Sequence, residues 1–161
     1  MTQASSVSQE KQASSVPPLL NRFMSALLRS PLHGIASRSV MLITFTGRKS
    51  GRSYTTPISY LREGRQVTGF TGAPWWRNLA GGAPVTLRIK GRDYRGCAAV
   101  VAKDKTAVAD ALQHFLRHVR SDARFYQVTY NAQGEPRRDE VERAAERCVL
   151  LRITLHEDDD A

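Results

Sequence analysis

Alternation of apolar and polar residues dominates the chain from residue 39 onward, and it predicts short β-strands. Val85, Leu87 and Ile89, for example, each precede a polar residue, so one face of that strand is apolar. The same pattern marks six segments: 39–46, 54–61, 66–71, 85–90, 93–102 and 148–155. Tight turns separate several of them, which favours an antiparallel sheet. Because closure removes the exposed edges of such a sheet, we expect a small barrel of about six strands.

Helical periodicity marks other segments. Residues 18–29 and 104–119 each carry apolar side chains spaced three or four apart, and Asp104 is a good N-cap for the second segment. A short helix is expected at 75–80, between Pro74 and a pair of glycines. The predicted fold class is therefore mainly β with flanking helices.

The length of 161 residues favours a single domain, which we place at 17–156. Residues 1–16 are rich in Ser, Gln and Ala, so a disordered tail is expected, and 157–161 form an acidic tail. The basic amphipathic helix at 18–29 either packs on the domain core or lies on a membrane surface. Since no run approaches the roughly 18 apolar residues of a membrane span, we expect a cytoplasmic protein. Peripheral contact with the inner face of the membrane, through 18–29, is the alternative.

The net positive charge of the chain limits which classes of binding partner are expected. Lys and Arg number 24 against 15 Asp and Glu, which gives a formal net charge of +9. This balance favours a nucleic acid, an acidic membrane surface or a multiply charged cofactor. Nucleic acid is not expected, because aromatic residues gather at 75–76 and 125–130, away from the cations Arg88 and Lys90. No metal site is expected either, since the four histidines form no ligand cluster.

A basic loop follows the first predicted strand. The apolar run 40–46 ends at Gly47, and Arg48, Lys49, Ser50, Gly51 and Arg52 come next. The glycines can adopt positive φ and let backbone N–H groups turn toward one point, where the cations and the serine hydroxyl add charge and a donor. Such a loop suits a phosphate or carboxylate group. The alternative is a solvated hairpin turn, since glycine and charged residues are common in turns.

Both tryptophans of the chain stand in a second unusual segment, 72–85. Trp75 and Asn78 share one face of the short helix expected there, which would place an aromatic wall and an amide donor beside a flat heterocycle. The alternative makes Trp75 a core anchor. Further along the chain, Tyr126 and Tyr130 are catalytic candidates that could donate a hydrogen bond to a substrate carbonyl.

Taken in order, these motifs resemble the deazaflavin-dependent nitroreductase/quinone reductase family. The shared pattern spans residues 19–155: an apolar strand, G-R-K-S-G-R, Thr-Thr-Pro, Tyr-Leu-Arg-x-Gly, W-W-R-N-L and a basic hairpin. The resemblance implies a split antiparallel β-barrel of the FMN-binding-like type. It also implies an oxidoreductase that uses reduced coenzyme F420 to pass a hydride to a small-molecule acceptor: a quinone, a nitroaromatic or an activated enone.

The resemblance further implies the residues of the site. In the family the glycine-bounded basic loop holds the cofactor's phosphate, and the tryptophan helix flanks its ring. Carried over to this sequence, the cofactor-binding residues are Gly47, Arg48, Lys49, Ser50, Gly51, Arg52, Thr56, Pro57, Trp75 and Asn78. Tyr54 stands where several members have a basic residue, and Arg52 is expected to replace that residue from the other side of the turn.

Several alternatives stay open at this point. Split barrels also hold FMN, whose phosphate would suit the same loop. A cofactor carrier without turnover and, ranked lowest, a basic nucleic-acid-binding module are further alternatives. Because the cofactor would carry the hydride, the chemistry requires no acid–base pair, and the sequence shows none. A monomer and a homodimer are both compatible with the sequence.

Overall fold

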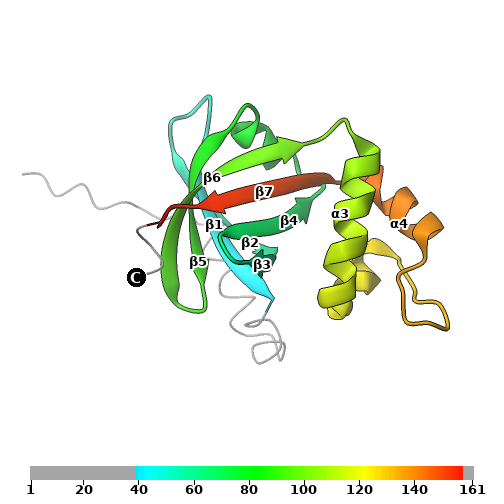
Figure 1. Cartoon of the computed structure of the whole chain (residues 1–161). Coiled ribbons are helices and arrows are strands. Elements are labelled where there is room, and N and C mark those ends of the chain that lie inside the picture. The colour runs from blue at the N-terminus through cyan, green and yellow to red at the C-terminus, as the bar shows by residue number, and fades with distance from the viewer. Residues whose placement is uncertain (1–38, 158–161) are drawn as a thin grey trace, which may run out of the picture.

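Residues 39–157 are described in the structure, a computed structural model, and they are organised around a seven-stranded antiparallel sheet (Figure 1). The strands are β1 (Val40–Thr46), β2 (Ser53–Ser59), β3 (Leu61–Glu63), β4 (Gln66–Thr71), β5 (Ala83–Ile89), β6 (Arg92–Val101) and β7 (Val149–Leu155). They lie in the order β2-β1-β5-β6-β7-β4-β3. The predicted tail at 1–16 and helix at 18–29 lie outside the described residues.

The two edge strands of this sheet, β2 and β3, are consecutive in the chain and separated only by Tyr60. One bent segment therefore pairs with β1, where Pro57 lies opposite Leu42, and then with β4, where Arg62 lies opposite Val67. This bend curls the sheet around on itself. Since this one stretch of chain forms both edges of the sheet, it brings the two edges together. The predicted split antiparallel barrel of about six strands is confirmed.

The barrel interior is filled by the inward-facing residues of the strands. Ile43 on β1, Leu87 on β5 and Ile153 on β7 have no exposed surface and belong to one apolar cluster. Removing such a side chain from water contributes about 1.5–3 kcal/mol. Apolar and polar residues therefore alternate along the strands because one face of each strand points into this core.

The helices cover one side of the barrel and form a second apolar cluster with it (Figure 1). They are α3 (Lys105–His118), the 3₁₀ helix η2 (Arg120–Tyr126) and α4 (Arg138–Ala145). The predicted helix at 104–119 is confirmed as α3, and Asp104 Oδ1 accepts a hydrogen bond from Ala107 N at 3.0 Å as its N-cap. Phe115 of α3 is fully buried and meets Phe70 of β4 edge-on, with ring centroids 5.3 Å apart.

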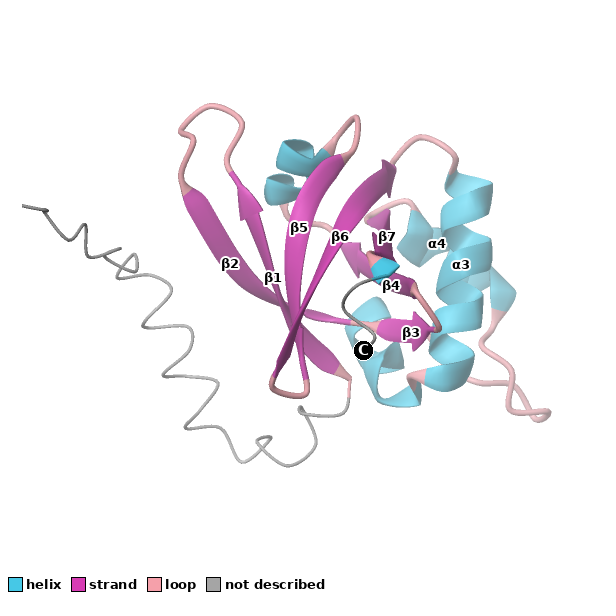
Figure 2. Ribbon diagram, turned by 60° about the vertical axis from the view of Figure 1, so that its left-hand side comes forward, coloured by secondary structure: helices cyan, strands magenta, loops and turns pink. Residues whose placement is uncertain are grey.

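Another 3₁₀ helix, η1 (Pro74–Leu79), lies where the short helix at 75–80 was predicted. Figure 2 shows this short helix at the same end of the sheet as the loop between β1 and β2. Pro74 begins η1, and its last residue, Leu79, is fully buried in the barrel cluster. The fold thus brings the two unusual sequence segments together. Within residues 39–157, no helix is both long and apolar enough to cross a bilayer.

Candidate functional site

A pocket of about 510 Å³ opens between the β1–β2 loop and η1. Its lining residues are Phe45, Gly47, Arg48, Lys49, Ser50, Tyr54, Trp75, Arg77 and Asn78. Two motifs that the sequence suggested separately, the basic loop and the tryptophan helix, therefore line one cavity. No acidic side chain of the described residues lines it, so its polar side is cationic.

The loop is a tight turn closed by its own backbone. The N–H of Gly51 donates to the carbonyl of Gly47 at 2.9 Å, and the N–H of Gly47 donates to the carbonyl of Arg52 at 2.8 Å. Gly51 has the positive φ expected of it, +66°. Gly47 is required for a different reason: a Cβ there would lie 2.6 Å from both Ser50 Oγ and the Tyr54 ring. The loop therefore has no room for a side chain at its first position.

Hydrogen bonds join the loop to η1. The backbone N–H of Arg48 donates to Asn78 Oδ1 at 3.0 Å, and the Arg48 guanidinium donates to the carbonyl of Arg77 at 2.9 Å. Asn78 Nδ2 in turn donates to the carbonyl of Trp75 at 2.9 Å. Both ends of the Asn78 amide are thus used within the protein. Arg48 and Asn78 fix the loop and the tryptophan relative to each other.

A row of three aromatic rings forms one wall of the pocket. Trp75 stacks on Phe45 with centroids 5.2 Å apart and an interplanar angle of 17°, and Phe45 stacks on Tyr54 at 5.9 Å and 24°. Phe45 is the last buried residue of β1, and β-pairing sets Tyr54 directly opposite it. The pairing of β1 with β2 therefore sets the position of the Phe45 ring, and Trp75 is oriented by stacking on that ring. The hydroxyl of Tyr54 lies 3.0 Å from Ser50 Oγ, which links the wall to the loop.

Lys49 is a cation of the pocket lining that the protein itself leaves available. Within the described part of the chain, its ammonium group forms no hydrogen bond or ion pair, whereas the Arg48 guanidinium is held by η1. The backbone N–H groups of Lys49 and Ser50 likewise have no partner among residues 39–157. One ammonium and two neighbouring N–H groups suit a phosphate oxygen. The residues present therefore fit a ligand that carries a phosphate and a flat ring.

Four of the predicted cofactor-binding residues do not line this pocket. Gly51 and Arg52 close the loop behind it. Thr56 and Pro57 lie further along β2, opposite Ile43 and Leu42. Conversely, the sequence interpretation did not place Phe45, Tyr54 and Arg77 in the site. Period-two alternation puts Phe45 and Tyr54 on the inner face, and that signal could have found them.

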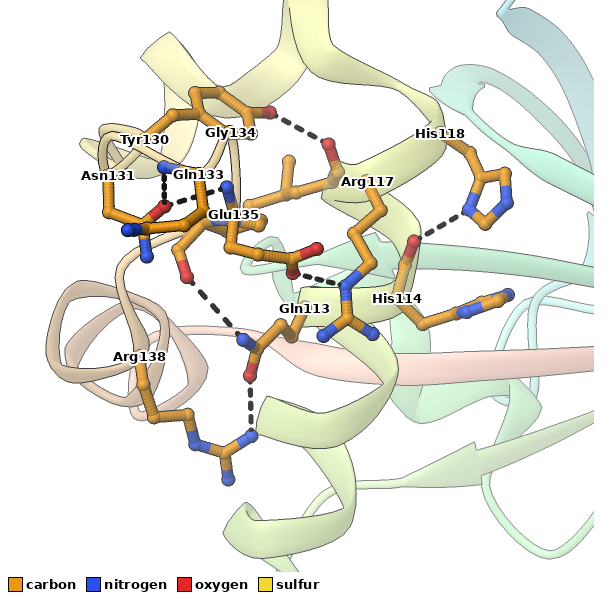
Figure 3. Close-up of polar contacts among 12 residues, drawn as sticks. Gln113, His114, Arg117, His118, Tyr130, Asn131, Gln133, Gly134, Glu135 and Arg138 are labelled. Carbon is orange, nitrogen blue, oxygen red and sulfur yellow. Dashed lines mark hydrogen bonds and ion pairs between the residues drawn. The ribbon is translucent and has the colours of Figure 1, made fainter.

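The two catalytic candidates lie away from the pocket, beside the helices. Tyr126 packs in the second apolar cluster, and burial raises the pKa of its hydroxyl well above the usual value. The Tyr130 hydroxyl donates to the carbonyl of Leu116 at 2.7 Å, as Figure 3 shows. Asn131 Oδ1 fixes the following loop by accepting from two backbone N–H groups. Both tyrosines thus help to hold the segment after α3 in place.

Comparison with protein families identifies the family of the chain. Residues 28–137 match the model of the F420H(2)-dependent quinone reductase family, and the match covers more than half of the 161 residues. The chain belongs to this family. The resemblance identified from the ordered motifs is confirmed, and the cofactor named in the family's description is F420. Comparison with curated proteins finds no significant match.

Similar solved structures include proteins whose descriptions name FMN, FAD and F420. A pyridoxamine 5'-phosphate oxidase-related, FMN-binding protein from Nostoc punctiforme is 15% identical, with 88% of this chain and 82% of that chain covered and a TM-score of 0.47. A FAD-binding protein from Mesorhizobium loti is 15% identical, with 80% and 91% covered and a TM-score of 0.46. A structure described as an F420 reductase is 12% identical, with 78% and 92% covered and a TM-score of 0.43.

Proposed function

We propose that this F420-dependent oxidoreductase binds reduced F420 in the pocket between the β1–β2 loop and η1, and that it reduces a quinone there. Nitroaromatics and activated enones are the other acceptors that the sequence resemblance implied. The family membership supports the cofactor and the reaction class. The pocket's residues support the place and manner of binding.

The observation that carries the proposal is the link between Arg48 and Asn78. It joins a cationic loop to an aromatic helix across 30 positions of sequence. A ligand with an anionic group at one end and a flat ring at the other can contact both parts at once. Neither part would suffice as a site for such a ligand, since the loop lacks an aromatic surface and η1 lacks an available ammonium group.

The residues have separate tasks in this proposal. Lys49 and the N–H groups of Lys49 and Ser50 bind the phosphate, where charge-assisted hydrogen bonds are strongest. Trp75, supported by Phe45, borders the ring and limits its position. Arg48 and Asn78 are positioning residues that keep the phosphate end and the ring end at a fixed separation. When bound, the reduced cofactor supplies the hydride, and the protein supplies orientation and electrostatics.

Titration of the purified protein with reduced F420 and, separately, with FMN tests the proposal. We expect saturable binding of reduced F420, followed by its oxidation when a quinone is added. Binding of FMN alone would replace the cofactor assignment, and binding of F420 without oxidation by any quinone, nitroaromatic or enone would show a carrier. The Lys49→Ala variant serves as the site-specific comparison, with Arg143→Gln on α4 as a control of equal charge change.

A further inference from the structure

A second pocket lies at the opposite end of β1 from the basic loop. Ser39, which directly precedes β1, lines it. The β5–β6 turn reaches the same end, because β-pairing sets Leu42 opposite Arg88 and the chain continues to Lys90. The cavity measures about 750 Å³, within the roughly 300–1,000 Å³ of ordinary ligand sites. It shares no lining residue with the candidate cofactor pocket.

The pocket combines a buried apolar floor with a cationic rim. Tyr60, Ile89, Tyr94 and Val119 form the floor, and each is only 4% to 6% exposed. The basic side chains of the lining are Arg62, Arg65, Lys90, Arg92 and His118. No Asp or Glu among the described residues belongs to the lining. An apolar floor beneath several cations suits a ligand that has a flat apolar body and a negative group.

Two of the rim arginines are held on the face of Tyr94. The guanidinium carbon of Arg62 lies 4.5 Å from the ring centroid, and that of Arg92 lies 5.6 Å from it. Arg62 Nε also donates to the carbonyl of Gly64 at 2.9 Å. Because the tyrosine ring already orders both side chains, an anion that meets them does not have to immobilise free arginines.

The remaining polar groups also suit an anion. Lys90 forms no hydrogen bond or ion pair within residues 39–157, so its charge is open to a ligand. Arg65 pairs with Glu157 at 2.8 Å, but that pair is exposed, and exposed pairs are weak because water and salt screen them. Burial raises the pKa of the Tyr60 hydroxyl in spite of the nearby Arg62, so this hydroxyl stays protonated and can donate to an anion.

We propose that this pocket is a second ligand site, which binds an aromatic oxyanion: a phosphate or carboxylate group carried on a flat ring. The ring lies on the apolar floor, and the oxyanion meets the rim cations. This binding does not depend on the proposed function of the first pocket, since the two cavities lie at opposite ends of β1.

Residue-resolved NMR titration tests the proposal on the full chain. The probes are 2-naphthyl phosphate, 2-naphthol, which has the ring without the charge, and inorganic phosphate, which has the charge without the ring. We expect 2-naphthyl phosphate to shift the amide signals of Gly64 and Gly91, and to bind there at least about tenfold more tightly than either other probe. Equal binding of 2-naphthol would overturn the oxyanion assignment. Shifts confined to the loop at 47–51 would show that only the first pocket binds anions.

Lys90→Asn provides a variant that removes one rim charge and keeps the fold. Lys90 and Gly91 both have positive φ, 48° and 82°, in the two-residue turn between β5 and β6. Asn-Gly is the preferred sequence for such a turn, so the substitution adds no backbone strain. We expect Lys90→Asn to weaken 2-naphthyl phosphate binding about fivefold, and Arg143→Gln, with the same change in net charge, to have little effect. Equal weakening by both variants would mean that net charge alone attracts the probe, and the proposal would fail.

Discussion

The backbone N–H of Arg48 lies 3.0 Å from Asn78 Oδ1, and this hydrogen bond joins the two parts of the candidate cofactor site. The other end of the same amide donates to the carbonyl of Trp75. The sequence suggested Asn78 as a donor beside the cofactor ring. In the structure its amide connects the basic loop to the tryptophan helix, so we expect Asn78 to affect a ligand through the positions of other groups.

Replacing Asn78 by Ala should separate these two parts. The variant loses two hydrogen bonds that each contribute about 0.5–1.5 kcal/mol, so the free energy of unfolding should fall only modestly. Reduced F420 should bind about tenfold more weakly, because its two ends no longer meet groups at a fixed separation, and kcat should fall as well. Thermal unfolding and fluorescence titration measure the two effects. Binding of reduced F420 at the parental affinity would show that the link does not organise the site.

The two loop glycines should respond differently to substitution by Ala. At Gly51 the added methyl meets no atom within 4 Å, but φ is +66°, so Gly51→Ala should cost about 1–2 kcal/mol of stability. At Gly47 the methyl would meet Ser50 and Tyr54 at 2.6 Å. Gly47→Ala should therefore displace the pocket lining and weaken cofactor binding more than Gly51→Ala does. Measuring Tm and the Kd for reduced F420 in both variants checks this prediction. Weaker cofactor binding by Gly51→Ala than by Gly47→Ala would contradict it.

Much of the fold could be predicted from the sequence because the barrel has one apolar core. Strands with one buried face must alternate, and α3 must carry an apolar stripe toward the sheet. The bend at Tyr60 was not predicted. Residues 62–65 lay between the predicted strands 54–61 and 66–71, whereas Arg62 and Glu63 belong to β3 and pair with β4. Local turn chemistry did not reveal that one continuous segment joins both edges of the sheet.

The site was predicted less completely than the fold. Glycines and cations identified the loop, and the tryptophans identified η1, because these residue types are unusual in strands. Alternation places Phe45 and Tyr54 on the inner face of their strands, but it does not show that the two rings stack on each other or that Phe45 stacks on Trp75. The 3₁₀ helix η2 was missed for a similar reason, since its polar sequence has no apolar stripe.

Asp122 of η2 should make stability depend on pH. Its side chain is buried, and burial raises the pKa of its carboxyl above the ordinary 3.8. The folded state therefore binds this proton more tightly than the unfolded state does. The free energy of unfolding should rise as pH falls through the raised folded-state pKa, and this gain is complete below the ordinary value of 3.8.

Asp122→Asn, which resembles the protonated form, should be more stable than the parent near neutral pH, and this advantage should shrink as pH falls toward 3.8. Urea denaturation of both proteins across this range measures the difference. A difference that does not vary with pH would contradict the sign of the shift.

Replacing Trp75 by Ala should affect turnover more than it affects stability. Trp75 is only partly buried and stacks on Phe45 at the mouth of the barrel, so its loss leaves the fully buried core residues in contact. A ring that is no longer confined reaches the productive orientation less often, so kcat should fall about tenfold or more. Steady-state kinetics with reduced F420 and a quinone measure this effect. An unchanged kcat would show that Trp75 anchors the core and does not orient the cofactor.

Lys49→Ala should give the opposite kinetic pattern. A charge-assisted hydrogen bond to a phosphate contributes about 1.5–3 kcal/mol, so the KM for reduced F420 should rise roughly ten- to a hundredfold. The phosphate is remote from the transferred hydride, and its contact is the same in the ground state and the transition state, so kcat should be nearly unchanged. Raising the salt concentration should imitate Lys49→Ala, because ions screen an exposed ammonium, and should not imitate Trp75→Ala. Arg143→Gln, which removes an equal charge from α4, should leave the KM near that of the parent. If Lys49→Ala binds reduced F420 like the parent at low salt, the loop is a solvated turn and the phosphate lies elsewhere.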